Sequence, residues 1–213
     1  MSTVAGILLA AGQSTRLGQP KQLLPYRGRS LLRHAAEVGL AAGLAPLIVV
    51  IGAAAPAMRR ELEGLAVQVV ENPRYAEGQS TSLRAGVAAL PPGTAAVVIL
   101  LVDMPAVDAE VIARLVEAWR ATAAPIVRPA YAGQPGHPVL FAAPLLPELA
   151  AVQGDEGGRA VLRRHAATTH LVPVATPGVL QDIDTWEAYR SLCAQPVGEG
   201  TLSGTSGGNH DRS

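Results

Sequence analysis

The fold of this chain is decided by residues 4–21, VAGILLAAGQSTRLGQPK. The apolar run from Val4 to Ala10 is short and bounded by small residues, which is typical of a strand buried on both faces of a parallel sheet. Ala11 and Gly12 then carry almost no side chain, so a ligand can lie directly against the backbone. The segment therefore predicts a buried strand that ends in a ligand-binding loop.

Two cations follow this loop. Arg16 and Lys21 are the only charged residues between Met1 and Pro25, and a guanidinium beside an ammonium suits the many oxygens of a polyphosphate. The spacing is not that of a Walker P-loop, in which lysine directly follows the second glycine, nor that of the Gly-x-Gly-x-x-Gly dinucleotide fingerprint. We expect a triphosphate-binding loop of another type. The alternative is an ordinary strand-to-loop connection with two solvated cations.

Composition narrows the class of protein. The chain has 213 residues, of which 49% are hydrophobic, so it is long enough to bury a substantial core. Lys and Arg (17) balance Asp and Glu (17), so no bulk charge favours nucleic acid or an anionic membrane. The single cysteine, Cys193, excludes an internal disulfide framework and a thiolate metal cluster. With no signal peptide or membrane-spanning run, we expect a cytoplasmic protein without nucleic-acid or membrane partners.

Apolar runs alternate with helical patterns along the chain, which is the signature of repeated β-α-β units. We therefore predict an α/β fold, Rossmann-like, with three α/β/α layers around a mainly parallel, mixed sheet. Residues 1–193 are expected to form a single domain. Residues 194–213 are rich in Gly, Ser and Thr and predict a disordered tail.

The expected boundaries follow the periodicity. Ser30 and Asp108 are expected helix N-caps, and Gly43 and Gly93 are expected helix stops. After Pro125 the pattern becomes irregular and predicts a wall that receives a second substrate. Strands are expected at 4–10, 47–51, 66–70, 95–102, 126–129, 137–141 and 170–174, and helices at 30–42, 56–63, 80–90, 108–122, 144–150, 158–165 and 185–192.

Small polar residues also precede a predicted helix. Residues Gly78 to Ser82 lead into the helix expected at 80–90. The N–H groups at a helix start, with hydroxyl and amide side chains beside them, can bind a base edge or an oxygen. Alternatively, Ser80 is simply an N-cap.

Carboxylates follow the buried runs as well. Asp103 comes directly after an apolar strand, where a carboxylate is costly unless it meets a cation or donors, so it is a candidate Mg²⁺ ligand. The alternative is a helix cap or turn former. Asp182 and Asp184 alternate about an apolar residue, and extended geometry puts both on one side, so the sequence alone does not choose between them.

The motifs together resemble nucleotidyltransferases with a glycosyltransferase-A-like fold, and within them the molybdenum cofactor cytidylyltransferases. The resemblance covers about residues 4–192. Guanylyltransferase relatives more often have glycine where Ala11 stands, so the resemblance favours cytosine. The chain departs from the family at Gly158, where alanine is more common, and at Trp186, where proline is. The motifs that carry the resemblance are LAAG (9–12) with Arg16 and Pro20-Lys21, GQSTSL (78–83), VDMP (102–105), GHPV (136–139), GDEGGR (154–159) and DIDT (182–185).

The resemblance implies a reaction and a set of roles. The terminal phosphate of molybdopterin attacks the α-phosphorus of CTP, giving molybdopterin cytosine dinucleotide and pyrophosphate. The product would pass to a recipient molybdoenzyme. The implied roles are Arg16, Lys21 and Asp103 in catalysis; Leu9, Ala10, Ala11, Gly12, Gln79, Ser80, Thr81 and Ser82 in nucleotide binding; His137, Asp155 and Arg159 in acceptor binding; and Asp103 and Asp184 as ligands of Mg²⁺.

Three alternatives stay open. His137 could be a packed histidine in a Gly-Pro turn instead of an acceptor contact. The enzyme could use another phosphorylated small molecule, such as a sugar or alcohol phosphate, because the second half of the chain decides the acceptor. The chain could also be a nucleotide-binding chaperone that delivers cofactor to a molybdoenzyme.

Overall fold

The computed structural model describes residues 3–14 and 17–194. Seven strands of these residues form one sheet in the order β10-β7-β9-β6-β1-β4-β5, and β8 pairs with β7 at its side. Their bounds are β1 (Val4–Leu9), β4 (Leu47–Ile51), β5 (Val67–Glu71), β6 (Ala96–Leu101), β7 (Ile126–Tyr131), β8 (Gln134–Pro135), β9 (Val139–Ala142) and β10 (Thr169–Pro173).

The sheet is mixed but mainly parallel, as predicted. Strand β1 lies inside the sheet between β4 and β6 and runs parallel to both, with Gly6 opposite Leu47 and Val4 opposite Ala96. Strand β9 runs antiparallel to β6 and β7. All six residues of β1 are buried, because helices cover both faces of the sheet. The continuous apolar run at the start of the chain therefore forms an interior strand of the sheet.

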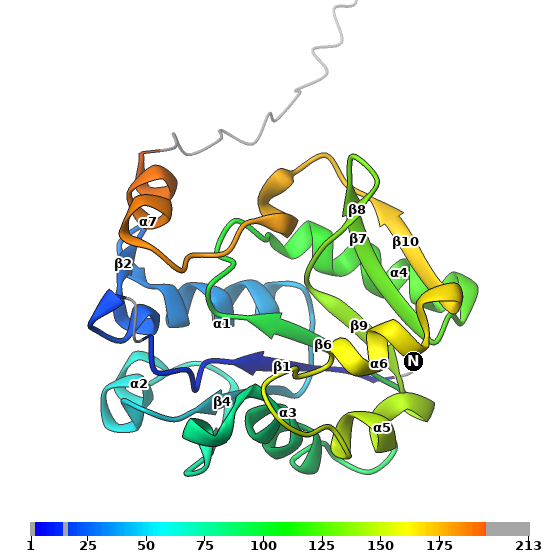
Figure 1. Ribbon diagram of the computed structural model, residues 1–213, viewed down its shortest axis with the longest axis horizontal. Helices are drawn as coiled ribbons and strands as arrows, with labels where there is room; N and C mark the ends of the chain where they lie inside the picture. The colour runs from blue at the N-terminus through cyan, green and yellow to red at the C-terminus, as the bar shows by residue number, and fades with distance from the viewer. Residues whose placement is uncertain (1–2, 15–16, 195–213) are drawn as a thin grey trace, which may run out of the picture.

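Two helical layers cover the sheet (Figure 1). Buried residues of α1 (Leu31–Ala41), α2 (Ala55–Glu61) and α4 (Ala109–Thr122) belong to the cluster on one face. Those of α3 (Gln79–Ala88), α5 (Leu146–Ala150) and α6 (Arg159–Arg164) belong to the cluster on the other. The predicted three-layer α/β/α architecture is confirmed. None of the described helices is long and apolar enough to cross a membrane.

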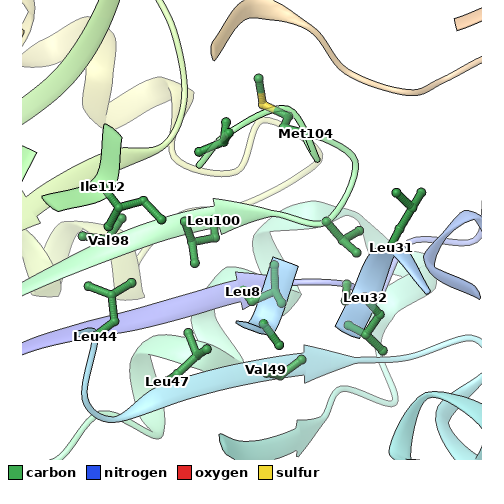
Figure 2. Close-up of a cluster of buried hydrophobic side chains, with 14 of the residues drawn as sticks. Leu8, Leu31, Leu32, Leu44, Leu47, Val49, Val98, Leu100, Met104 and Ile112 are labelled. Carbon is green, nitrogen blue, oxygen red and sulfur yellow. The ribbon is translucent and has the colours of Figure 1, made fainter. Parts of the chain in front are cut away.

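The larger core joins the first helix to the central strands. Figure 2 shows Leu8, Val49 and Leu100 of three neighbouring strands together with Leu32 of α1. Leu8, Val49 and Leu32 are fully buried. On the opposite face, a Cβ added to Gly86 of α3 would lie 2.6 Å from a methyl carbon of Ile7. Helix α3 therefore packs directly against β1, which fixes its N-terminus beside the loop that follows the strand.

Most helix ends are those expected. Ser30 Oγ accepts from Arg33 N at 3.1 Å, and Asp108 Oδ1 accepts from Val111 N at 2.8 Å, so both N-caps are confirmed. Helix α1 ends at Ala41, just before Gly43, which has φ 76°. The stop predicted at Gly93 is wrong, because α3 ends at Ala88. Two prolines follow, and a residue before proline is driven out of the helical region.

Three short strands were not predicted from the sequence pattern, and β8, beside β7, is one of them. Strands β2 (Pro25–Tyr26) and β3 (Arg29–Ser30) form a separate antiparallel hairpin, too short to show any periodicity. The final helix α7 (Trp186–Cys193) lies beside it, and Tyr189 Oη donates to Pro25 O at 2.5 Å (Figure 1). Apart from Ala194, the tail predicted at 194–213 lies outside the described residues.

Candidate active site

A cavity of about 760 Å³ lies at the edge of the sheet where the parallel strands β1 and β6 end. In open α/β sheets, ligands bind beyond the carboxyl ends of the strands, so its location agrees with the prediction. Tyr75 is the aromatic residue of its lining and was not foreseen from the sequence. The wall is formed by Leu9, Ala11 to Ser14, Leu17, Lys21, Gln22, Tyr75 to Gln79, Ser82, Leu101 to Asp103, Asp155, Arg159 and Asp184.

Lys21 joins the two predicted metal ligands. Its Nζ donates to Asp103 Oδ2 at 2.7 Å and to Asp184 Oδ1 at 2.8 Å. Asp103 follows β6, whereas Asp184 precedes α7, so residues far apart in the chain meet at one ammonium group. The backbone supports the arrangement: Lys21 Nζ also donates to Ile183 O at 3.2 Å, and Ile183 N donates to Asp103 O at 2.8 Å.

The charge of Lys21 is held by its partners. Burial by itself lowers the pKa of the ammonium, but attraction to Asp103 and hydrogen bonds to Asp103 and Asp184 outweigh it, so the pKa is raised above its usual value. The side chain of Lys21 is 13% exposed, that of Asp103 22% and that of Asp184 43%. The lysine is therefore positively charged at every physiological pH.

The donor set fits a divalent cation. Two carboxylates already converge on one positive charge, and carboxylate oxygens are the ligands that Mg²⁺ and Mn²⁺ prefer. Among the described residues there is no group of three or more His, Cys, Asp or Glu side chains that could hold a metal. The remaining ligands would therefore be other oxygens, such as those of phosphate, water or the backbone. Asp182 is exposed and acts electrostatically on His137, while Asp184 is the residue beside Lys21.

A buried glutamine organises the first loop. Gln22 is 0% exposed, and its Nε2 donates to Ala10 O at 2.8 Å and to Gly12 O at 2.7 Å. Its Oε1 accepts from Ser14 Oγ at 3.3 Å, and that hydroxyl accepts from Lys21 N at 3.0 Å. Gln22 was not foreseen from the sequence, where the one signal was a polar residue next to the lysine.

The start of α3 is capped from another part of the chain. Gly78 is its N-cap residue, with φ 114°, and a Cβ there would lie 2.7 Å from Gly154 O. Asp155 Oδ1 accepts from Gln79 N at 3.0 Å. Asp155 therefore supplies the capping carboxylate that glycine lacks. Ser80 is the second helical residue and not the N-cap, and its buried Oγ makes no hydrogen bond within the described structure.

Asn72 ties the end of β5 to the same helix. This buried residue donates from Nδ2 to Thr81 Oγ1 at 2.8 Å and to Ser82 Oγ at 2.9 Å. Thr81 Oγ1 also donates to backbone carbonyls, including Gly78 O at 2.9 Å. The hydroxyl of Thr81 is thus used inside the protein, whereas Ser82 lines the cavity.

The structure brings most of the predicted site residues together, but not all of them. Ala10 and Ser80 are buried, and neither lines the large cavity. Thr81 lines a separate groove of about 710 Å³. Arg16 lies outside the described residues. The predicted residues that line the large cavity are Leu9, Ala11, Gly12, Lys21, Gln79, Ser82, Asp103, Asp155, Arg159 and Asp184.

His137 lines a smaller pocket of about 70 Å³, whose walls include Leu9, Gln79 and Arg159 from the large cavity. Burial, with repulsion from Arg128 and Arg159, lowers the pKa of His137 to about 4 despite the opposing effect of Asp182. The imidazole is therefore neutral at pH 7. Its buried Nδ1 makes no hydrogen bond to any described residue.

A loop of small residues and a lysine-bridged pair of carboxylates line one cavity at the carboxyl edge of the sheet. This arrangement suits nucleotidyl transfer, and the class of protein is that of the nucleotidyltransferases. Within that class the family is shown by comparison. Residues 6–169 match the MobA-like NTP transferase domain, and the chain belongs to this family.

Similar proteins carry more than one name. The chain is 35% identical over 199 residues to nicotine blue oxidoreductase of Paenarthrobacter nicotinovorans, covering 89% of this chain and 96% of that protein. It is 26% identical over 186 residues to molybdenum cofactor cytidylyltransferase of Escherichia coli strain K12, covering 87% and 93%. The crystal structure of Rv0371c of Mycobacterium tuberculosis H37Rv in complex with manganese has a TM-score of 0.75 and 33% identity, covering 91% and 99%.

Proposed function

We propose that this protein transfers CMP from CTP to the terminal phosphate of molybdopterin, giving molybdopterin cytosine dinucleotide and pyrophosphate. The observation that carries the proposal is the bridge from Lys21 to Asp103 and Asp184, beside the loop of small residues. The name of the Escherichia coli relative supports the acceptor and the base. The product would be passed to a recipient molybdoenzyme in the cytoplasm.

The chemistry needs charge neutralisation more than proton transfer. An oxygen of the acceptor phosphate forms a bond to the α-phosphorus of CTP, and the bond between that phosphorus and the oxygen of the β-phosphate breaks. A phosphate monoester is largely dianionic near pH 7, because its second pKa is about 6, so no dedicated general base is required. The remaining barrier is the approach of two anions, which positioned cations lower.

The residues divide this work. Asp103 and Asp184 would hold a divalent cation, proposed to be Mg²⁺, with Mn²⁺ as the ion seen in the related crystal structure. When bound, that ion would supply positive charge to the phosphate oxygens. Lys21, with Arg16, would stabilise the departing pyrophosphate. This role requires the Lys21 ammonium to exchange a carboxylate for a phosphate oxygen.

The other residues would bind the two substrates. Leu9, Ala11 and Gly12 line the cavity on the nucleotide side, and Gln79 and Ser82 do so at the start of α3. The acceptor would lie toward Arg159 and the adjoining pocket of His137. A cavity of about 760 Å³ falls within the range of volumes that ligand pockets span.

Pyrophosphate release tests this proposal. Purified protein is assayed with CTP, GTP, ATP or UTP, with and without molybdopterin, in Mg²⁺ and in Mn²⁺. The proposal expects release that requires both CTP and molybdopterin. Preference for GTP would overturn the base assignment. Release with a sugar or alcohol phosphate in place of molybdopterin would reassign the acceptor, and binding without release would favour a maturation chaperone.

The name of the Paenarthrobacter relative makes an oxidoreductase the second candidate. The observation in its favour is 35% identity along 96% of that protein. Against it, the loop after β1 lacks the dinucleotide fingerprint, and the site gathers carboxylates about a lysine. A redox assay with and without a nicotinamide cofactor, in the absence of CTP, separates the two. Turnover there, with no pyrophosphate release in any combination, would replace the transferase proposal.

A further inference from the structure

The backbone of the first loop is asymmetric in its hydrogen bonding. Three successive carbonyl oxygens point toward the protein. Those of Ala10 and Gly12 accept from the fully buried amide of Gln22, at 2.8 and 2.7 Å. The oxygen of Ala11 lies against Gly52, since a Cβ added to that glycine would be only 2.7 Å away.

Two N–H groups of the same loop, in contrast to its carbonyl groups, are not engaged by the described part of the protein. Within the described residues, the N–H groups of Ala11 and Gly12 donate to no protein group, and both residues line the large cavity. A ligand therefore meets a loop whose donors are available and whose acceptors are engaged. The Gln22 amide produces this asymmetry, because each of its two N–H bonds occupies one carbonyl.

We propose that Gln22 is a positioning residue that makes this loop a surface of hydrogen-bond donors, and that it thereby selects cytosine over guanine nucleotides. The inference rests on the proposed function, in which this loop lies on the nucleotide side of the cavity, and it places the base against Ala11 and Gly12. Cytosine offers two neighbouring acceptors, O2 and N3, to such donors. Guanine offers two neighbouring donors on its Watson–Crick edge, N1–H and the N2 amino group, which need acceptors that Gln22 has already engaged.

A third hydrogen bond, to Ser14, keeps the Gln22 amide in the required orientation. The Ser14 hydroxyl donates to Gln22 Oε1 at 3.3 Å, so the nitrogen and not the oxygen faces the two carbonyls. The same hydroxyl accepts from the backbone N–H of Lys21 at 3.0 Å. The base loop and the catalytic lysine are thereby joined through one glutamine and one serine.

Direct binding of nonreactive CTP and GTP analogues, measured by titration calorimetry without acceptor, tests the inference. The wild type is expected to prefer the CTP analogue. In Gln22→Met, which keeps the side-chain length but removes both donors, the preference should fall about tenfold, the value of one lost hydrogen bond. The ratio of two affinities is unaffected by any loss of folded protein, so a merely structural role would leave it unchanged.

Two further variants complete the experiment. Gln22→Glu keeps the shape but can donate to at most one of the two carbonyls, and only when protonated, so it should lower the preference in the same direction even if the methionine variant folds poorly. Gln19→Met changes an exposed glutamine of the same turn and should leave the ratio as in the wild type. An unchanged ratio in both Gln22 variants, or a wild type that prefers the GTP analogue, would overturn the inference while the transferase assignment stands. If the wild type binds neither analogue, the proposed function is refuted instead.

Discussion

Replacing Lys21 by methionine tests the central arrangement of the site. The change keeps an unbranched stem and removes the ammonium from between two carboxylates. The bond to Asp103, at 2.7 Å between side chains only 13% and 22% exposed, should contribute about 2 kcal/mol as a charge-assisted hydrogen bond. The bond to Asp184, which is 43% exposed, is discounted for solvent screening to about 0.5 kcal/mol.

The expected loss of unfolding free energy is therefore about 2 to 3 kcal/mol, or a fall in Tm of roughly 4 to 12 °C for a chain of this size. Urea unfolding followed by circular dichroism measures the first quantity and a thermal scan the second. Millimolar Mn²⁺ or Mg²⁺ should restore part of the loss, because a divalent ion replaces the ammonium between the carboxylates. Metal should therefore stabilise the variant more than the wild type.

Arg120→Met, at an exposed cation of α4, is the matched control and should change stability by less than about 0.5 kcal/mol. A loss below about 1 kcal/mol in Lys21→Met, outside the range of buried charged pairs, would refute the role of the lysine as the bridge. Equal stabilisation of variant and wild type by metal would refute the proposed position of the cation.

Three further predictions concern the neighbouring residues. Asp103→Ala should abolish pyrophosphate release with little change in the circular dichroism spectrum, since its side chain lies at the cavity and not in the core; near-normal release would contradict its role as a metal ligand. Asp155→Ala should lower stability by about 1 kcal/mol through the lost α3 cap and raise the KM for the nucleotide, whereas an unchanged KM would limit Asp155 to a structural role. Protonation of His137 should destabilise the fold as pH falls, because its folded pKa of about 4 lies below the unfolded value of 6.5; stability is fully present above pH 6.5 and is lost toward pH 4. Between pH 7.5 and pH 5 the free energy of unfolding of the wild type should fall by about 2 kcal/mol through this group. In His137→Asn the fall should be smaller by about 2 kcal/mol, as measured by urea titrations at pH 7.5 and pH 5.

Local patterns were sufficient for most of the fold. The apolar run at 4–10 and the Ser30 and Asp108 caps act over a few residues, so the sequence displays them directly. The prediction failed at Gly93, where the prolines after Leu90 outweighed the glycine. The β2–β3 hairpin was missed because strands of two residues carry no periodicity.

The residues of the site were predicted from the sequence more fully than the hydrogen bonds and ion pairs that join them. Asp103 and Asp184 were foreseen as ligands of one metal ion and Lys21 as a separate phosphate contact, and the structure joins all three through one ammonium. Asp155 was expected at the acceptor, and it also caps α3. Such contacts form between segments distant in the chain, so the spacing of residues in the sequence does not predict them.

The order of residues alone shows that a buried strand leads into a loop of small residues, and that Asp103 follows another buried strand. These features depend on side-chain volume and local backbone preference, which the order of residues specifies. The contact of Asp184 with Lys21, the exposure of Asp182 and the bonds of Gln22 to the loop carbonyls are visible only in the folded protein. Hydrogen bonds and ion pairs require atoms within about 3 Å, and these bonds depend on tertiary packing that no local pattern specifies.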